Sequence, residues 1–176
     1  MGNKLELTWL GKEKEIKIEP RILIENKELS NTEHDSETEN MLIHGDNLLA
    51  LKALESKYAG QMKCIYIDPP FNTGTRINAD GEEIGYNDNL EHSIWLSLIR
   101  SRLQYLKVLM RDDGVIFVHL DDKEAAYCKV LLDEVFGRKN YINTVIWEKK
   151  YSPQNDAKWL SDNHDFILVY AKNKDV

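Results

Sequence analysis

The sequence contains little of what membrane proteins and disulfide-stabilised proteins are built from. No apolar run approaches the ~20 residues that a membrane-spanning helix requires, and the first residues include no apolar signal core. Cys64 and Cys128 lie in apolar stretches, which indicates small core residues and argues against a disulfide framework. Neither they nor the histidines have the spacing of a metal site. We therefore expect a cytoplasmic protein that uses no membrane and no metal.

Positive charge is also scarce, because 23 Lys and Arg face 30 Asp and Glu, which gives a net charge of −7 at pH 7. This balance argues mildly against a free-standing nucleic-acid-binding protein, but it leaves room for a catalytic module whose DNA grip lies elsewhere. Residues 138–160 are the exception, with five basic residues against two acidic ones. Within them Lys149 and Lys150 are candidates for phosphate contacts, and a solvated loop is an equally good interpretation.

The 176 residues, of which 42% are hydrophobic and 30% charged, fit one soluble globular domain preceded by a short extension. Alternating apolar residues in 5–10 and 16–18 predict a β-hairpin or two extended segments, and the acidic stretch 33–39 is typical of a linker or flexible loop. We therefore divide the chain into an N-terminal extension, 1–39, and a catalytic-looking domain, 40–176.

The domain alternates strand and helix patterns. Strands are predicted at 41–43, 63–67, 115–120, 141–148 and 165–171, and helices at about 47–58, 90–111 and 121–137. Gly114 reads as the stop of the second helix, and the polar stretch 72–89 as a long functional or mobile loop. This order predicts an α/β fold with a mostly parallel, doubly wound sheet and an antiparallel hairpin at one edge. The apolar strand 63–67 is expected at its centre, covered on both faces.

The most informative motif follows the strand 63–67. Asp68-Pro69-Pro70-Phe71 presents a carboxylate, backbone carbonyls and an aromatic ring at the carboxyl end of a strand, where open α/β sheets bind ligands. Two prolines fix φ and stiffen the turn. A carboxylate and a carbonyl together can accept both N–H bonds of a planar amine, while the ring stacks on its base. The alternative is that the prolines end the strand and Asp68 caps a turn.

Together with several further segments, this motif makes the chain resemble the modification subunit of type III restriction–modification systems over nearly its whole length. These subunits are β-group adenine-specific DNA methyltransferases, and their proteins are much longer. The resemblance is carried by residues 5–9, 19–23, 44–51, 65–74, 92–96, 102–103, 114–118 and 164–172.

The resemblance implies a class I methyltransferase fold and a methyl donor, S-adenosylmethionine. It implies that Asp68 and the Pro69 carbonyl hold the amine of an adenine flipped out of double-stranded DNA, with Pro70 completing the motif and Phe71 stacking on the base. Asp68 would also line the cofactor. Asn72, Thr73 and Gly74 would lie on the DNA side, together with Lys149 and Lys150.

Six other positions have a structural explanation beside or in place of a functional one. The resemblance puts His44, Gly45 and Asp46 beside the adenosine of the cofactor, while Asp46 is equally well explained as a helix cap. Asp121 and Asp122 read as helix caps, and the apolar stripe around Trp95 reads as core.

One family feature is missing from the 176 residues. No Phe-x-Gly-x-Gly turn for the cofactor is present. We therefore expect an incomplete domain, inactive without a cofactor-binding half, that associates with itself, with a complementary methyltransferase half or with a restriction subunit. The alternative function is a catalytically silent remnant, or half of a split enzyme, with a structural role in a complex. A methyltransferase acting on RNA or protein is a third reading, disfavoured by the resemblance of the N-terminal segment.

Overall fold

The computed structural model describes residues 6–14, 17–19, 21–31, 37, 39–72, 76–77, 83–84, 91–151 and 160–176. At its centre is a four-stranded sheet with the order β1-β4-β6-β5. Its strands are β1 (Met62–Ile67), β4 (Met110–Leu120), β5 (Tyr141–Glu148) and β6 (His164–Ala171). β1 runs parallel to β4, whereas β4 and β5 each pair antiparallel with β6. The predicted α/β class and the antiparallel pair at one edge are confirmed.

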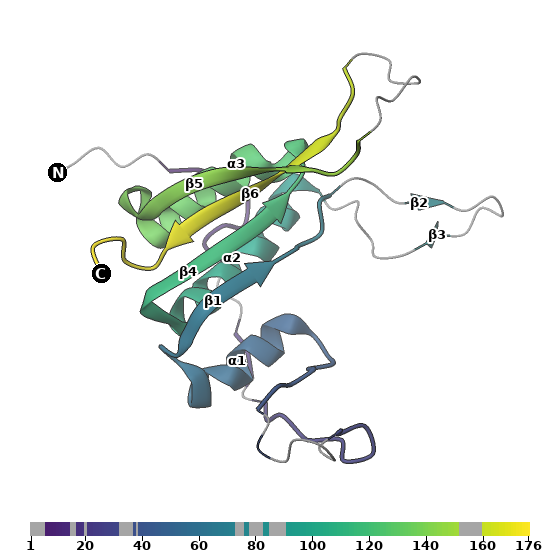
Figure 1. The fold of residues 1–176 in the computed structure, drawn as a ribbon, viewed down its shortest axis with the longest axis vertical. Helices are drawn as coiled ribbons and strands as arrows, with labels where there is room; N and C mark the ends of the chain where they lie inside the picture. The colour runs from purple at the N-terminus through teal and green to yellow at the C-terminus, as the bar shows by residue number, and fades with distance from the viewer. Residues whose placement is uncertain are drawn as a thin grey trace.

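The helices are α1 (Asn47–Tyr58), α2 (His92–Leu109) and α3 (Asp122–Leu132), and α3 continues into a π-helical turn η1 (Asp133–Gly137) and a 3-10 turn η2 (Arg138–Asn140). α2 and α3 lie on one side of the sheet, behind it in Figure 1, whereas α1 packs on α2 beyond the β1 edge. The buried core forms between α2, α3 and the sheet, and it includes Trp95, Leu103, Ile116, Val118, Leu131 and Tyr170. Among the described residues, no helix has both the length and the apolar character needed to cross a membrane.

β1 lies at the edge of the sheet, not at the predicted centre. Its side chains alternate, so Ile65 and Ile67 pack on the core while Cys64 and Tyr66 are exposed. The sheet is therefore mixed, with its single parallel pair at the β1 end. An apolar strand predicts burial, but it does not say which neighbouring strands supply the cover.

The sheet face opposite the helices is open in the described part of the chain (Figure 1). Strand pairing puts Tyr66 beside Phe117 on this face, and Val145 beside Ile167. Tyr66, Val145 and Trp147 are each about half exposed, at 55%, 46% and 54%. We call the surface of Tyr66, Phe117, Val145, Trp147 and Ile167 the open apolar face.

Three local predictions differ from the structure. Residues 41–43 form no strand, and Leu42 is 99% exposed, because no described strand lies beside them. Gly114 lies inside β4 and does not end α2. A Cβ at Gly114 would meet the carbonyl oxygens of Arg111 and Met62 at 2.9 Å, so the close approach of β1 and β4 requires glycine here. The loop 72–89 contains two short antiparallel strands, β2 (Arg76–Ile77) and β3 (Glu83–Ile84).

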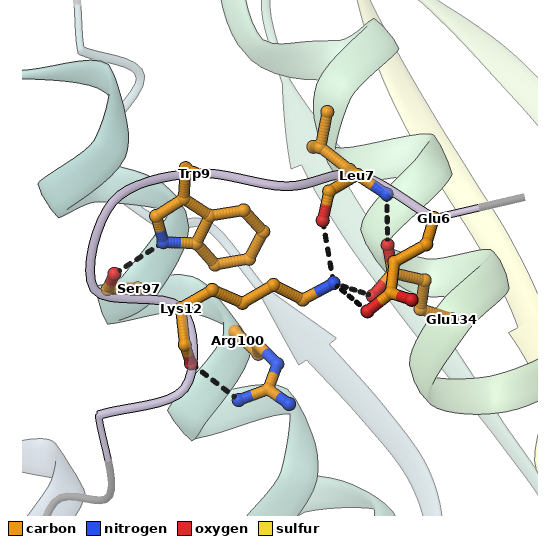
Figure 2. Close-up of polar contacts among 7 residues, drawn as sticks. All are labelled: Glu6, Leu7, Trp9, Lys12, Ser97, Arg100 and Glu134. Atoms are coloured by element: carbon orange, nitrogen blue, oxygen red, sulfur yellow. Dashed lines mark hydrogen bonds and ion pairs between the residues drawn. The ribbon is translucent and has the colours of Figure 1, made fainter.

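Residues 6–14 cross α2 and η1, and we call them the N-terminal strap (Figure 2). Where a hairpin was predicted, the described residues 6–14 and 17–19 contain no strand, and the chain turns at Trp9–Lys12. The indole Nε1 of Trp9 donates to Ser97 Oγ at 2.7 Å. The buried Lys12 ammonium donates to Glu6, the Leu7 carbonyl and Glu134 at 2.6–2.9 Å. Burial works to lower the pKa of Lys12, but hydrogen bonds to the two carboxylates raise it overall.

Candidate active site

Asp68 is the first residue beyond β1, and its side chain is exposed. Among the described residues, none donates a hydrogen bond to its carboxylate. Pro69, Pro70 and Phe71 are half-buried, and Phe71 packs against the core. Its ring lies over the His119 ring, with 5.6 Å between the centroids and 50° between the planes. The motif therefore combines an accessible acceptor with an aromatic ring supported from below.

Trp95 of α2 fixes the backbone of this motif. Its side chain has no exposed surface, and its indole Nε1 donates to the Pro70 carbonyl at 2.7 Å. The prediction that Trp95 is core is confirmed, and the same ring also anchors the motif. Because an unmade buried hydrogen bond is costly, this contact holds the Pro70 peptide in one orientation.

Glu124 of α3 fixes Asn72, the residue after the motif. Asn72 has φ +57°, a left-handed conformation that Asn tolerates better than most residues. Its Nδ2 donates to Glu124 Oε1 at 2.8 Å. Glu124 is only 3% exposed, and His92 Nδ1 lies 3.1 Å from its carboxylate. We call Trp95, Glu124 and His92 the loop clamp, because together they hold the turn after Asp68 from the helix side.

A second polar group lies on the open side of the same strands. Tyr66 Oη is 2.8 Å from His119 Nδ1, and His119 Nε2 is 3.4 Å from Asp165 Oδ2. Lys149 Nζ donates to Asp165 at 2.9 Å and to Asp162 at 3.0 Å. Burial and the negative charge of Asp68 both raise the pKa of Tyr66, so its hydroxyl keeps its proton.

The turn His44-Gly45-Asp46 precedes α1. Asp46 is the N-cap of α1, and its Oδ1 accepts from the amides of Leu48 and Leu49 at 3.0 and 3.1 Å. Gly45 has φ +151° and His44 is exposed. The capping role is therefore present, and the cofactor role of the three residues stays a prediction.

The other predicted residues are distributed as follows. Lys149 is engaged by two carboxylates, whereas Lys150 is exposed. Thr73 and Gly74 lie outside the described residues. Asp121 is the N-cap of α3 and accepts from the Lys123 amide at 3.0 Å. Burial raises the pKa of Asp121.

Sequence reasoning missed Glu124 and His119. Glu124 stands three residues after the cap Asp121, where an acidic residue is ordinarily explained by helix capping, and this hides its bond to Asn72. His119 is a polar residue near the carboxyl end of a strand that runs parallel to β1. That position is a recurrent ligand-binding position in open α/β sheets, and it was the available signal.

The described residues fit one side of a methyl-transfer site better than the other. Asp68 and the aromatic rings around it supply an acceptor and a wall for a planar amine. None of the described turns has the glycine-rich strand-to-helix form through which backbone amides approach a nucleoside cofactor. The chain thus fits the amine substrate more fully than it fits the methyl donor.

Comparison with known proteins gives consistent results. A family model described as "DNA methylase" matches residues 62–176. The chain is 45% identical over 140 residues to a probable type III restriction-modification enzyme HindVI Mod subunit from Haemophilus influenzae, covering 78% of this chain and 18% of that protein. It is 33% identical over 197 aligned positions to the type III EcoP15I Mod subunit of Escherichia coli, covering 96% of this chain and 30% of that protein. The chain therefore spans less than a third of the length of each of these two relatives.

A solved structure shares the fold. The M1.HpyAVI–SAM complex superposes with a TM-score of 0.51 at 16% identity, over 75% of this chain and 54% of that one. This likeness supports the predicted class I methyltransferase fold. The family match covers well over half of the chain and contains both the Asp68 motif and the clamp that holds it. The chain belongs to the DNA methylase family, and within it the chain is similar to the modification subunits of type III restriction–modification systems.

Proposed function

We propose that this chain is the catalytic-motif module of an adenine-N6 DNA methyltransferase in a restriction–modification system. The observation that carries the proposal is the contrast at the end of β1. The Asp68 carboxylate is exposed, while the loop clamp holds Pro70 and Asn72 through hydrogen bonds of 2.7 and 2.8 Å. An acceptor on a fixed backbone can select the orientation of an amine without being reorganised during the reaction.

In this function Asp68 accepts one N–H of the target amine and the Pro69 carbonyl accepts the other. Trp95 occupies the Pro70 carbonyl, so the two neighbouring carbonyls have different roles. With both N–H groups held, the nitrogen lone pair is directed away from the motif toward the methyl donor. Phe71 stacks on the base, which must leave the duplex to reach the site. The Asp in the first motif position favours adenine by the pattern of the resemblance.

The methyl donor in this proposal is S-adenosylmethionine, which supplies an electrophilic methyl group. His44, Gly45 and Asp46 would face its adenosine, and Asp68 would border the methyl group. The chain has no Phe-x-Gly-x-Gly turn, so firm binding of the donor requires additional polypeptide. The chain alone should bind S-adenosylmethionine weakly or not at all by calorimetry, and low-micromolar affinity would contradict this.

Double-stranded DNA is the proposed substrate, and the two relatives named above are subunits of type III restriction-modification enzymes. We propose a complementary methyltransferase half, a restriction subunit or a second copy of this chain as protein partners. Asn72, Thr73, Gly74 and the exposed Lys150 are the proposed DNA contacts. Lys149 reaches a phosphate only if it leaves Asp162 or Asp165.

A catalytically silent, complex-forming remnant is the competing function, and one experiment separates the two. Residues 1–176 replace the matching segment of the Haemophilus influenzae Mod subunit, and this chimera is incubated with DNA and labelled S-adenosylmethionine. Mass spectrometry of the nucleosides should show N6-methyladenine. A folded, DNA-binding chimera that makes N4-methylcytosine, or no methylated base while the parent subunit is active, would contradict the proposal.

A further inference from the structure

His119 lies beside the motif without belonging to it. Ile67, the residue before Asp68, pairs with Val118 across the parallel strands, so His119 is the next residue along β4 at the level of Asp68. Its side chain points to the open sheet face, as those of Tyr66 and Phe117 do. The imidazole therefore stands between β1, the motif turn and β6, and it contacts a residue of each.

The contacts of His119 select one form of the ring. His119 Nε2 lies 3.4 Å from Asp165 Oδ2 without hydrogen-bond geometry, and the negative charge of this carboxylate favours a neutral imidazole with its proton on Nε2. Nδ1 then keeps its lone pair and accepts from the Tyr66 hydroxyl at 2.8 Å. The carboxylate can only accept, whereas the Tyr66 hydroxyl can donate or accept, so the negative charge of Asp165 decides this assignment of the protons.

Asp165 is itself held in place. Its side chain is 5% exposed, and Lys149 Nζ donates to its other oxygen at 2.9 Å. A buried carboxylate needs such a partner to remain charged. Burial opposes the charge of Lys149, but hydrogen bonds to Asp165 and Asp162 raise the pKa of Lys149 overall. Lys149, Asp165, His119 and Tyr66 thus form a row of complementary groups, in which Asp165 and His119 lie at 3.4 Å without hydrogen-bond geometry.

This row of side chains contacts or adjoins the Asp68 motif at two points. The centroid of the Phe71 ring lies 5.6 Å from that of the imidazole, and Tyr66 of β1 is two residues before Asp68. We propose that His119 is a positioning residue of the methyl-transfer site, which fixes the Phe71 ring and the Tyr66 phenol on either side of Asp68. This inference rests on the proposed function for its role, whereas the ring geometry stands without it.

The first arm of the test measures the ring form in the 176-residue chain. Two-bond ¹H–¹⁵N correlation on histidine-labelled chain should show His119 as the Nε2–H form, assigned by its loss in His119→Gln. The exposed His44 in the same spectrum serves as the control for an unrestrained ring. Tyr66→Phe should move the Nδ1 resonance and leave the proton on Nε2. An Nδ1–H form, or a mixture like that of His44, would overturn the assignment.

The second arm measures methyl transfer in the chimera. His119→Leu should lower kcat about tenfold or more, with KM for DNA changed less than about threefold, because a misplaced group costs rate more than binding. Gln offers an acceptor to Tyr66 and a donor to Asp165, so His119→Gln should recover most of this loss. His164→Leu at the start of β6 is the matched control and should keep the parental kcat.

The two proposals fail in different ways. If the chimera makes no methylated base while His119 has the expected ring form, the proposed adenine methyltransferase function is wrong, and the positioning role of His119 in it is lost with it. An active chimera in which His119→Leu keeps the parental kcat, or in which His119→Gln is as impaired as His119→Leu, overturns the positioning role alone. If His119→Leu does not fold, Tyr66→Phe and His119→Gln still decide, since both keep a polar or aromatic group of similar size.

Discussion

At the scale of single residues, the site separates an exposed group from the groups that hold it. Asp68 is exposed and makes no hydrogen bond to another described side chain. Trp95 and Glu124 are buried and form hydrogen bonds to Pro70 and Asn72. Phe71 occupies the boundary, with one part against the core and one part outside it. Trp95 and Glu124 thus hold the backbone after Asp68, and the Asp68 carboxylate stays accessible to a substrate.

Phe71→Ala in the chimera should weaken the hold on the flipped base by about 1–3 kcal/mol, because stacking is one of several contacts to it. Phe71→Tyr and Phe71→Trp keep an aromatic face and should keep activity. A 2-aminopurine placed at the target position reports stacking through its fluorescence. The same signal and rate in Phe71→Ala as in the parent would show that the ring does not contact the base.

Trp95→Phe in the 176-residue chain should lower the free energy of unfolding by about 1–3 kcal/mol. The indole donor is lost and the half-buried Pro70 carbonyl keeps no partner in the described structure. Trp147→Phe on the open apolar face is the matched control and should change stability by less than ~0.5 kcal/mol. Urea unfolding compares the two, and equal midpoints would mean that the bond to Pro70 contributes nothing.

At the scale of elements, the helices and the later strands were predictable because their patterns are local. The apolar stripe of α2, the capping Asp46 and Asp121, and the strands β5 and β6 agree with the sequence analysis to within a few residues. Gly114 was misread because its reason is a long-range one, the close approach of Met62. The loop clamp was invisible for the same cause, since Trp95 and Glu124 reach the motif across 25 and 52 positions of sequence.

The N-terminal strap depends on one buried ammonium. Lys12→Met should lower the free energy of unfolding by about 3 kcal/mol at neutral pH, because the largely buried Glu134 carboxylate loses its cationic partner and keeps only the Leu7 amide. Glu6 is more exposed and contributes less to this cost. Lys14→Met, at an exposed position two residues away, is the control and should be nearly neutral. Equal stability of the two variants would show that the strap is not held by Lys12.

The pH dependence of the strap follows from the raised pKa of Lys12. A lysine whose pKa is higher in the folded state stabilises the fold fully below its unfolded pKa of about 10.5, and the contribution disappears as pH rises through the folded value. The stability difference between the parent chain and Lys12→Met should therefore be constant from neutral pH to about pH 10 and shrink above it.

At the scale of the whole molecule, α2 and α3 cover one face of the sheet and the open apolar face has no described cover (Figure 1). β1 also has a free edge in the described structure, next to the motif. Exposed apolar surface and an unpaired strand edge both favour association. The face and the edge meet at Tyr66, so a partner that covers them also approaches Asp68.

The 176-residue chain should therefore self-associate as its concentration rises and bind a hydrophobic dye. Trp147→Lys puts a charge on the open apolar face and should shift the association to higher concentration. Lys139→Gln, at an exposed position away from that face, is the control. Sedimentation at several concentrations gives the answer, and a monomer that binds no dye at high concentration would contradict the expectation.

The most direct test of the account is the single-turnover rate of methyl transfer by the chimera with Asp68→Ala. Asp68 is exposed beyond the end of β1, so folding and cofactor binding should remain close to those of the parent. Loss of one charge-assisted hydrogen bond to the amine should cost about 3 kcal/mol or more, roughly a hundredfold or greater fall in rate. Asp68→Asn keeps one acceptor oxygen, so its rate should lie between those of the parent chimera and Asp68→Ala. Near-normal methylation of adenine by Asp68→Ala would contradict the catalytic assignment and leave the motif as a turn that ends a strand.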